Sequence, residues 1–507
     1  MIKQLLVFIL IGASLSFHLF YASHFNFAFT IDQARDMLEI RKIAVDHHLI
    51  MIGPTTSING VYLGPFWYYF NLPAFIVGGG DPTTLVYWAV IFYHFSVLLF
   101  WIRYRRTNPH FGIIGSLLFL VSPRLLEAIS YSFSANVAPT FVLLVLLLLE
   151  IVLLSKKPLA AVILGILVGL SVQTEIAFCI LLLPLVLFWL IKDRVRLIRQ
   201  FLIGFSLTLI PQAAFEVKHK FMMTKIFIAE FAGQGDILGD KLSISQKLID
   251  RHSRFFGDLS SSLSISQSII WLLLLCLALV ILGRKTQKLA LLSISLIIFS
   301  FPFYLLYPHI IKPWYTISLA VPFILIFASG ITDLYESHKT ILKVSTVVLL
   351  SLIFLKAYQQ FSHRLEYKLT TRSTDRASLL NQIETIDWVY REAAGSGFKV
   401  YNYAPSVYDF NYQYLFWWYG SKAYGYQPIS ITYQDNVPPY LETLSKYQSN
   451  IRPNDRPMTF LIKEGRLGFE DGEKAWRHQF DDLCKMGETK LTGAIVVEKL
   501  SACYEKN

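Results

Sequence analysis

Charged residues are scarce in this chain of 507 residues. They make up 16% of it, and hydrophobic residues make up 54%, whereas charge in a soluble protein is expected on about a quarter of the residues. The mean hydropathy is +0.48. This balance excludes an ordinary soluble protein and predicts a polytopic integral membrane protein.

Cysteine is also rare, with four residues in the chain. Cys179 and Cys276 lie in apolar runs, and we interpret them as small core hydrophobes. Cys484 and Cys503 share the polar C-terminal part, where they could form one disulfide if that part is extracytoplasmic. The four form no zinc-like cluster. The sequence also lacks 20–50-residue repeats and a low-complexity linker.

Acidic residues are outnumbered, because 46 Lys and Arg face 35 Asp and Glu, for a net charge of +11. In a soluble protein this excess would suggest a nucleic-acid partner. Here much of it lies in short loops between apolar segments, at 103–110, 155–158, 192–199 and 283–288. Such loops face the cytoplasm. We therefore expect no nucleic acid, a cytoplasmic N-terminus and an extracytoplasmic chain after about Tyr358.

Apolar runs of about 20 residues are long enough to cross a bilayer as helices. The first, from about Gln4 to Tyr21, is interpreted as an uncleaved signal anchor because many spans follow it. About eleven transmembrane helices are expected, the one at Phe111 being short. The later ones begin near Pro82, Phe111, Asn136, Pro158, Ile176, Gln200, Ser268, Lys288, Trp314 and Ile341.

Two domains follow from this pattern. Residues 1–358 form a mostly α-helical membrane domain, with long extracytoplasmic loops at 22–81, 122–136 and from Glu216 to about Ser264. Residues 359–507 are polar and aromatic, and they predict a small α/β extracytoplasmic domain. Its expected elements are a helix in "RASLLNQIETIDWVYREAAG" and strands in "GFKVYNYA" and "GAIVVEKL". The aromatic stretch "YNYAPSVYDFNYQYLFWWYG" is compatible with sugar contact, a domain core or a membrane-facing surface.

Directly after the first span comes "FTIDQARDMLEIRK", where Thr30 and Gln33 form a capping-box pattern that predicts a helix start. The helix is amphipathic and fits the membrane surface. Asp32 lies in its first turn, where exposed N–H groups stabilise negative charge. The nearby negative charge of Asp36 disfavours the ionised form of Asp32, and Arg35 can pair with either acid. A carboxylate there can orient and deprotonate a hydroxyl; the alternative is an ordinary solvated face. The charged positions Asp32, Arg35, Asp36, Glu39, Lys42 and Asp46 recur on one side.

The next segment, "GPTTSINGVYLGPFWYYFNLPAFIVGGGDP" (53–82), is rich in Gly, Pro and aromatic residues. Trp67, Tyr68 and Tyr69 suit the membrane interface. An Asp-led helix after the first span followed by a Pro-aromatic segment resembles the GT-C glycosyltransferases. The nearest pattern is that of the protein O-mannosyltransferase and aminoarabinose-transferase-like families, glycosyltransferase family 39 in the broad sense. "PQAAFEVKHKF" and "YPHIIKPWYTISLAVPFIL" are similar to the polar ends of later spans in such proteins.

The resemblance implies a polyprenyl-phosphate-linked sugar as donor and attack by an acceptor hydroxyl on the extracytoplasmic face, with inversion. Asp32 matches the acid that activates the acceptor in these families. The sequence departs from the pattern at Gln33, where many relatives have Glu, at Gly64, where a Lys is common, and at Asn136, near a frequent Asp. The resemblance leaves open whether a divalent metal ion takes part, and whether the acceptor is a glycan, a lipid or a protein.

A departing lipid phosphate needs cations near it. Lys312, beside Pro313 and Trp314, is the strongest candidate. The alternative for each cation is contact with lipid headgroups. Glu175 and Glu216 either hold the acceptor or pair with cations such as Arg124 or Lys218, and pairing is the favoured interpretation. Gln173 and Asn136 suit sugar hydroxyls. The expected lipid-phosphate group comprises Lys312, His309, Arg124, Lys218 and His219.

The sequence therefore predicts an inverting glycosyltransferase of the plasma (cell inner) membrane, in contact with membrane lipids. A transporter or flippase of lipid-linked sugars is the leading alternative, and it would show inverted halves and ionisable residues near mid-span. No clear halves are seen, and the charges gather at the ends of spans. A relative that only binds lipid-linked sugars is the other alternative.

Overall fold

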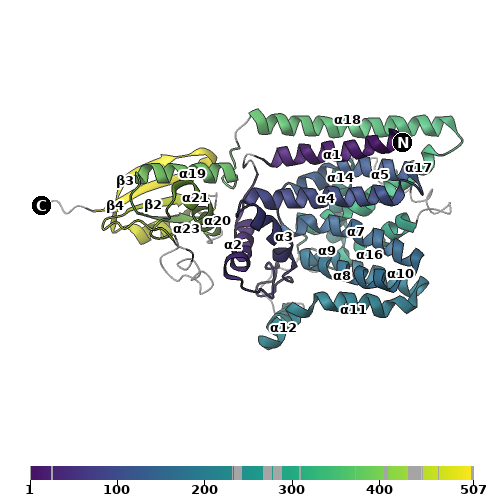
Figure 1. Ribbon diagram of the computed structural model, residues 1–507, viewed down its shortest axis with the longest axis horizontal. Helices are drawn as coiled ribbons and strands as arrows, with labels where there is room; N and C mark the ends of the chain where they lie inside the picture. Colours follow the sequence, from purple (N-terminus) through teal and green to yellow (C-terminus); the bar gives the residue numbers. More distant parts are fainter. Residues whose placement is uncertain are drawn as a thin grey trace. The chain divides into compact units, whose positions relative to one another are not determined.

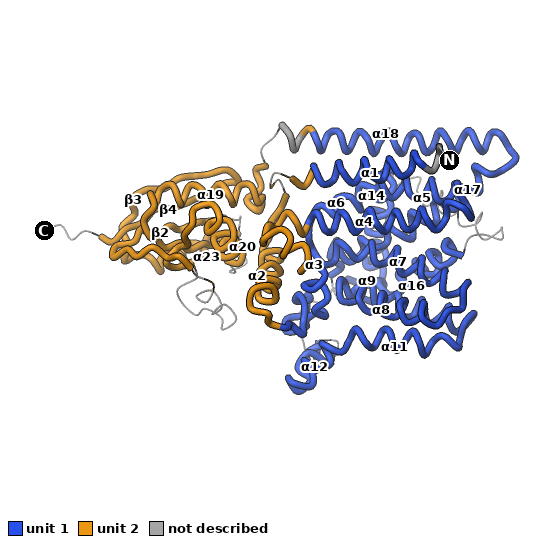
Figure 2. Tube along the Cα trace, viewed as in Figure 1, with its two compact units in different colours: residues 1–20, 49–71, 86–365 blue, residues 21–48, 72–85, 366–507 orange. Residues whose placement is uncertain are grey.

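The computed structural model describes residues 2–503 except 24, 26, 231, 233–241, 266–276, 278–287, 308–309, 371–372, 405–408, 432–446, 448 and 466–467. The chain forms two compact units, each built from three separate segments (Figure 2). Unit 1 comprises residues 1–20, 49–71 and 86–365, and unit 2 comprises 21–48, 72–85 and 366–507.

Unit 1 is a bundle of helices (Figure 1). Their apolar composition and length follow from the hydrophobic runs of the sequence, and several begin at a proline, which is favoured in the first turn. The helices that lie wholly or mainly in it are α1 (Ile2–Ala22), α4 (Pro82–Tyr104), α5 (Pro109–Val121), α6 (Pro123–Ile129), α7 (Ser134–Ser155), α8 (Pro158–Thr174), α9 (Ile176–Cys179), α10 (Leu182–Asp193), α11 (Ile198–Thr208), α12 (Ile210–Lys218), α13 (Met222–Ala229), α14 (Ile244–Leu263), α16 (Lys288–Leu306), α17 (Ala320–Tyr335) and α18 (Thr340–Thr370).

Most of the predicted spans have a matching helix. Within the described residues, seven stretches are long and apolar enough to cross a membrane, and two bent helix pairs bring the number to nine. The shorter α8 is also apolar, so ten of the predicted positions carry helices. The span expected near Ser268 lies outside the described residues. The run at Phe111 is short because α5 and α6 meet at a bend of 58°.

The long loops predicted between spans contain helices of their own. The first includes α2 (Ile31–Asp46) and α3 (Phe66–Val77), the second includes α6, and the third includes α13 and α14. The last span, α18, continues to Thr370, beyond the predicted domain boundary at residue 358.

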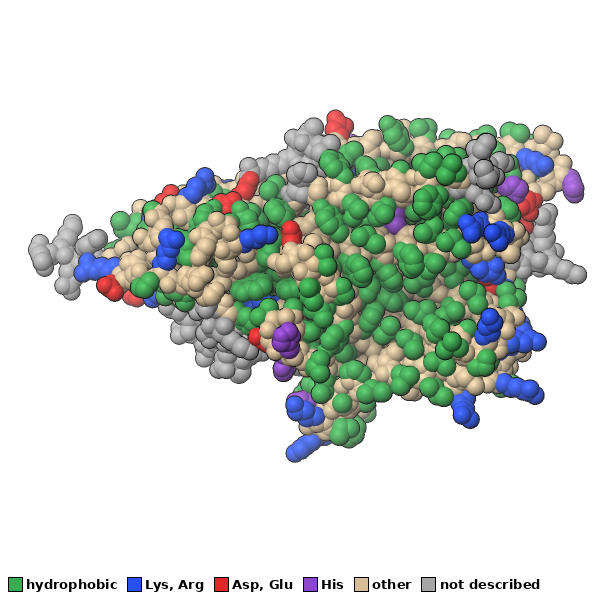
Figure 3. Space-filling model, viewed as in Figure 1, with side chains coloured by type: hydrophobic (Ala, Val, Ile, Leu, Met, Phe, Trp, Pro, Cys, Tyr) green, Lys and Arg blue, Asp and Glu red, His purple; other side chains and the backbone are tan. Residues whose placement is uncertain are grey.

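The surface of unit 1 has the pattern of a membrane protein. Hydrophobic side chains cover the sides of the helices, and Lys and Arg side chains gather at their ends, most densely at one end of the bundle (Figure 3). Side chains such as Ile191, Leu306 and Ile341 are 64–79% exposed, which a bilayer but not water would favour. The prediction of a mostly α-helical polytopic membrane protein is confirmed.

Unit 2 contains the predicted α/β domain. Its sheet has the order β1-β2-β4-β3, with β1 (Phe398–Tyr403) parallel to β2 and the other neighbours antiparallel. The helix predicted at 376–395 is α19 (Leu379–Ala393), and the two predicted strands are β1 and β4. These three predictions are confirmed. The other elements are β2 (Met458–Lys463), β3 (Leu483–Lys490), β4 (Val496–Ala502), α20 (Phe410–Leu415), a π-helical turn (Phe416–Gly420), α21 (Ser421–Tyr424) and α23 (Glu470–Arg477).

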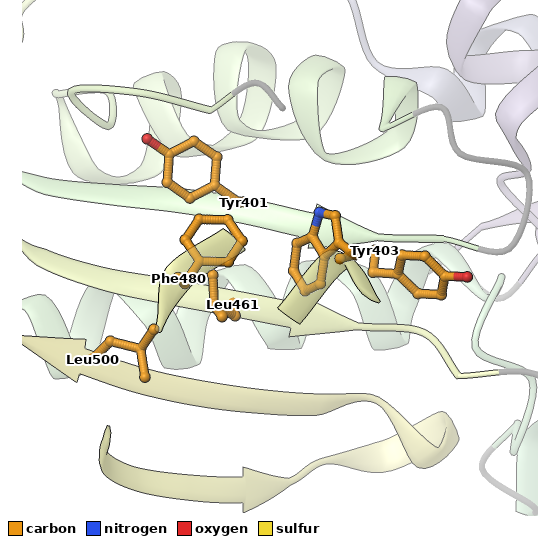
Figure 4. Packing of buried hydrophobic residues seen from close by; sticks show 6 residues of the cluster. Tyr401, Tyr403, Leu461, Phe480 and Leu500 are labelled. Atoms are coloured by element: carbon orange, nitrogen blue, oxygen red, sulfur yellow. The ribbon is translucent and has the colours of Figure 1, made fainter. Parts of the chain in front are cut away.

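Alternating residues of the strands face opposite sides of this sheet. On one side Phe398 and Phe460 contact Tyr390 and Trp388 of α19. On the other side Tyr401, Tyr403, Leu461 and Leu500 pack with Trp476 of α23 and with Phe480 (Figure 4). Helices therefore cover both faces of the sheet.

The two tail cysteines come together at the edge of this sheet. Cys484 on β3 and Cys503, just after β4, form a disulfide with a Cα–Cα distance of 4.9 Å. Cys179 is buried and free, which agrees with its interpretation as a core residue. Cys276 lies outside the described residues.

One buried carboxyl makes the stability of unit 2 depend on pH. Glu464, after β2, is 7% exposed and accepts a hydrogen bond from Gln382 Nε2 at 3.3 Å. Burial raises its pKa from 4.5 to about 7. Between these two pH values the unfolded chain releases a proton that the folded chain keeps. Stability is therefore highest below the unfolded pKa and falls as the pH rises through this window, by roughly 3 kcal/mol in all.

We expect Glu464→Gln to remove this loss, because a carboxamide keeps the hydrogen bonding without ionising. The variant should match the wild type near pH 4 and exceed its unfolding free energy by about 3 kcal/mol at pH 8. Thermal unfolding of the purified full-length protein at both pH values measures this. Glu488→Gln, at a more exposed carboxylate of the same sheet, is the matched control. An unchanged pH dependence in Glu464→Gln would contradict the assignment.

Candidate functional site

The charged helix after the first span is α2. It begins as the sequence predicts, with Thr30 as N-cap and the Gln33 side chain accepting the Thr30 backbone N–H at 3.0 Å. This capping box fixes the first turn, which carries Asp32 as its only acid. The helix is amphipathic, but its buried side includes the polar residues Gln33, Asp36 and Arg41. The buried side of α2 therefore packs against other parts of the protein and does not face apolar surroundings alone.

Arg35 joins the two acids of the predicted catalytic group. Its Nη1 lies 3.0 Å from Asp32 Oδ1, and its Nη2 lies 2.8 Å from Asp36 Oδ1. Its Nε donates to the same Asp36 oxygen at 3.1 Å. The Asp32 side chain is 46% exposed, whereas that of Asp36 is 3% exposed. Asp36 therefore anchors Arg35 from inside, and Asp32 is the more accessible of the two carboxylates.

Arg41 is a residue that the sequence reasoning missed. It is 1% exposed, and its guanidinium carbon lies 3.7 Å from the ring centroid of Tyr447 and 4.8 Å from that of Trp417. The sequence carried a signal for it, since Arg41 lies four residues after Met37 and three before Ala44, on the apolar side of the helix. An arginine on the apolar side of a helix indicates that a specific group of the protein contacts its guanidinium.

In unit 1 the structure brings two of the predicted cations together. Arg124, on α6, donates from Nη2 to the Pro313 carbonyl at 2.8 Å and pairs with Asp258 of α14 at 2.9 Å. Lys312 precedes Pro313, and its Nζ lies 5.2 Å from the ring centroid of Trp314. Arg124 thus anchors the segment that carries Lys312. Asp258 was not anticipated, because its partner is distant in sequence. His309 lies outside the described residues.

Lys218 and His219 lie elsewhere on unit 1, at the end of α12. His219 stacks on Phe215 with ring centroids 4.2 Å apart, and both cations are exposed. Exposed apolar residues surround them, including Val217 at 67% and Phe221 at 54%. This environment resembles that of interfacial cations. A role in holding lipid phosphate stays a prediction for these two.

Glu175 and Glu216 have backbone partners rather than the cations that the favoured interpretation gave them. Glu175 accepts from the N–H groups of Ala177 and Phe178 at the start of α9, at 3.0 and 2.7 Å. Glu216 accepts from Met223 N and Thr224 N, both at 2.9 Å, at the start of α13. The expected pairing with Arg124 is wrong, because Arg124 pairs with Asp258. Both acids cap helix starts, where exposed N–H groups stabilise carboxylates.

The uncharged candidates also make local contacts. Asn136, in the first turn of α7, donates to the Tyr131 carbonyl at 3.1 Å. Gln173 accepts from Phe66 N at 3.2 Å and donates to the Thr208 carbonyl at 2.6 Å. The position of Gln173 also explains why residue 64 is a glycine, since a Cβ at that position would lie 2.1 Å from Gln173 Oε1.

The Pro-aromatic segment is therefore tied to the helix bundle. Trp67 and Tyr68 are 0% and 3% exposed, so they pack inside the protein rather than at the expected interface. Tyr69 donates to the Ile50 carbonyl at 3.1 Å. Within the part of the chain that the structure describes, no group of three or more His, Cys, Asp or Glu side chains is placed to hold a metal ion.

The bundle of membrane helices, the amphipathic helix after the first span and the small C-terminal α/β domain together define the GT-C fold. Crystal structures of ArnT from Cupriavidus metallidurans are similar to this chain in fold. The structure bound to undecaprenyl phosphate matches with a TM-score of 0.59, and the apo structure matches with 0.60. In both cases 11% of residues are identical and 97% of each chain is covered.

The fold expected from the sequence resemblance is thereby confirmed. No family model matches the chain, and no curated protein sequence does. The likeness lies in the three-dimensional structure, over nearly the full length of both proteins.

Proposed function

We propose that this protein is an inverting glycosyltransferase that moves a sugar from a polyprenyl-phosphate carrier to an acceptor hydroxyl on the extracytoplasmic face of the membrane. The observation that carries the proposal is the ArnT-like fold over 97% of the chain, in which an exposed carboxylate leads the helix after the first span. One of the ArnT structures holds undecaprenyl phosphate, which favours a lipid of that class as the carrier.

In this mechanism Asp32 is the general base. Its carboxylate accepts the proton of the acceptor hydroxyl while the acceptor oxygen bonds to the anomeric carbon. The bond between that carbon and the phosphate oxygen breaks in the same step, so the sugar inverts. Arg35 keeps Asp32 in one orientation through the 3.0 Å contact, and the buried Asp36 keeps Arg35 in place.

The leaving group is the polyprenyl phosphate, on which negative charge develops. We assign Lys312 to this phosphate, because its ammonium group lies beside the Trp314 ring and Arg124 holds its backbone segment. Fixed cations at a developing charge lower the barrier more than mobile ones do. Arg124 is itself neutralised by Asp258, so its part in binding phosphate is the smaller one.

The orientation of the chain follows from its charges. Lys and Arg side chains gather at one end of unit 1 (Figure 3), and we assign that end to the cytoplasm, as proposed for the basic loops. With that end inside, the N-terminus is cytoplasmic and the C-terminal domain is extracytoplasmic. An oxidising compartment suits the disulfide between Cys484 and Cys503.

The test is sugar transfer by membranes that contain the protein, supplied with radiolabelled polyprenyl-phosphate sugars. We expect label to move from at least one donor into the lipid, glycan or protein fraction, and membranes without the protein serve as the control. Extracts of the source cell envelope supply the acceptor. The fraction that gains label identifies the acceptor class.

Transfer from no donor, together with movement of the lipid-linked sugar across proteoliposome membranes, would replace the proposal with a flippase. Binding of the donor without transfer or movement would indicate a relative that only binds lipid-linked sugars.

A further inference from the structure

The helix α2 and the C-terminal domain belong to one compact unit. The contact includes Arg41, whose guanidinium lies over the rings of both Trp417 and Tyr447. The Tyr447 hydroxyl in turn donates to Asp46 at the end of α2. Trp417 belongs to the π-helical turn that follows α20, so the aromatic stretch of the tail packs against the candidate catalytic helix.

The chain just before α2 is fixed to the same domain by backbone groups. Phe29 N donates to the Ala377 carbonyl at 2.7 Å, and Leu379 N donates to the Phe27 carbonyl at 2.9 Å. Asn411, on α20, donates to the Phe29 carbonyl at 2.6 Å. The start of α2 is therefore held by hydrogen bonds and its C-terminal half by Arg41.

The chemistry of Arg41 makes this contact specific. Burial lowers its pKa to about 10, so it is charged at neutral pH. Among the described residues its Nε and Nη1 have no hydrogen-bond partner, and the two ring faces supply the negative potential that a buried guanidinium needs. A planar guanidinium stacks on two rings at once, which an ammonium group does not do.

We propose that Trp417 and Tyr447 are positioning residues for transfer: by clamping Arg41 they fix α2, and with it Asp32. The inference rests on the proposed function and deepens it, because it makes the C-terminal domain part of the catalytic apparatus. Nine residues separate Asp32 from Arg41, about 14 Å along a helix. A continuous helix transmits a tilt at Arg41 to Asp32, and a displacement of about 1 Å in a catalytic group can cost 100-fold in rate.

The test compares single variants of the full-length protein. We expect Trp417→Leu and Tyr447→Leu to lower kcat by about 10- to 100-fold with the KM for the donor nearly unchanged. Trp417→Phe keeps a ring face and should restore most of kcat. The matched control is Tyr419→Leu, from the same π-helical turn, since Tyr419 contacts Trp418 and Asp387 instead of α2.

A second measurement is independent of activity. Hydrogen exchange of the peptide covering 31–46 should be faster in Trp417→Leu than in the wild type and in Tyr419→Leu. Unchanged kcat in a folded Trp417→Leu protein would overturn the proposal, and so would unchanged exchange in α2. A wild type that transfers no sugar counts against the proposed function instead, and the exchange experiment then decides whether the clamp exists.

Discussion

Asp32→Asn is expected to abolish most sugar transfer, with kcat at least 100-fold below that of the wild type, because general bases contribute about 10²–10⁴-fold. The substitution largely preserves the shape of the side chain and its hydrogen bond. Asparagine has the shape of aspartate, and its carbonyl oxygen can still accept the hydrogen bond from Arg35. What it loses is the ability to take a proton from the acceptor hydroxyl. The KM for the donor should therefore change little while kcat collapses.

The matched control is Glu39→Gln, two turns further along α2, where the carboxylate pairs with Lys42 at 2.5 Å. It removes one charge from the same helix without touching the Asp32 group, so kcat should stay within about twofold of the wild type, the scale of one ion pair between neighbouring helix positions. Full transfer by a folded Asp32→Asn protein would move the base elsewhere. Asp36 is then the next candidate, and Asp36→Asn would be measured in the same assay.

Arg35→Leu is expected to lower both stability and activity. It removes the cation that two carboxylates share, and one of them, Asp36, is 3% exposed. Breaking a buried ion pair costs roughly 3–5 kcal/mol. The exposure of Arg35 is 18%, so a value near 3 kcal/mol is expected. Activity should fall by at least 10-fold, because Asp32 loses the group that orients it.

Two variants bracket this prediction. Arg35→Lys keeps the charge but presents an ammonium group, which cannot bridge both acids in the geometry of the planar fork, so intermediate stability and activity are expected. Lys42→Leu is the control, because among the described residues Lys42 pairs with Glu39 and not with the Asp32 group. Thermal unfolding in detergent and donor turnover are the measurements. Equal stability of Arg35→Leu and the wild type would show that Asp36 does not depend on this pair.

Local sequence patterns predicted much of the fold. Ten of the expected spans have helices because hydrophobic length is a local property that the bilayer imposes. The start of α2 was predictable because the capping box needs only Thr30 and Gln33. In the C-terminal domain, the apolar positions of α19 and the short runs "GFKVYNYA" and "GAIVVEKL" were sufficient for the same reason.

Partners that are far apart in sequence could not be predicted. Arg124 was identified as a cation, but the carboxylate that neutralises it is Asp258 on α14. Glu175 and Glu216 were identified as acids at the ends of spans, yet helix starts rather than cations satisfy them. Arg41 was missed because its partners, Trp417 and Tyr447, lie more than 370 positions later in the chain. Choosing among such distant residues requires the folded chain.

The division of unit 2 among three chain segments determines when the candidate site can form during biosynthesis. The ribosome makes α2 among the first 50 residues, but Ala377, Asn411 and Trp417 emerge only after the membrane bundle has been made. Until then Arg41 and the segment around Phe29 have none of these contacts. Closing contacts over such a separation is slow, and the N-terminal parts of a chain are made first during synthesis. The last quarter of translation therefore completes the packing of α2, so premature termination there leaves an inserted bundle whose α2 is unsupported.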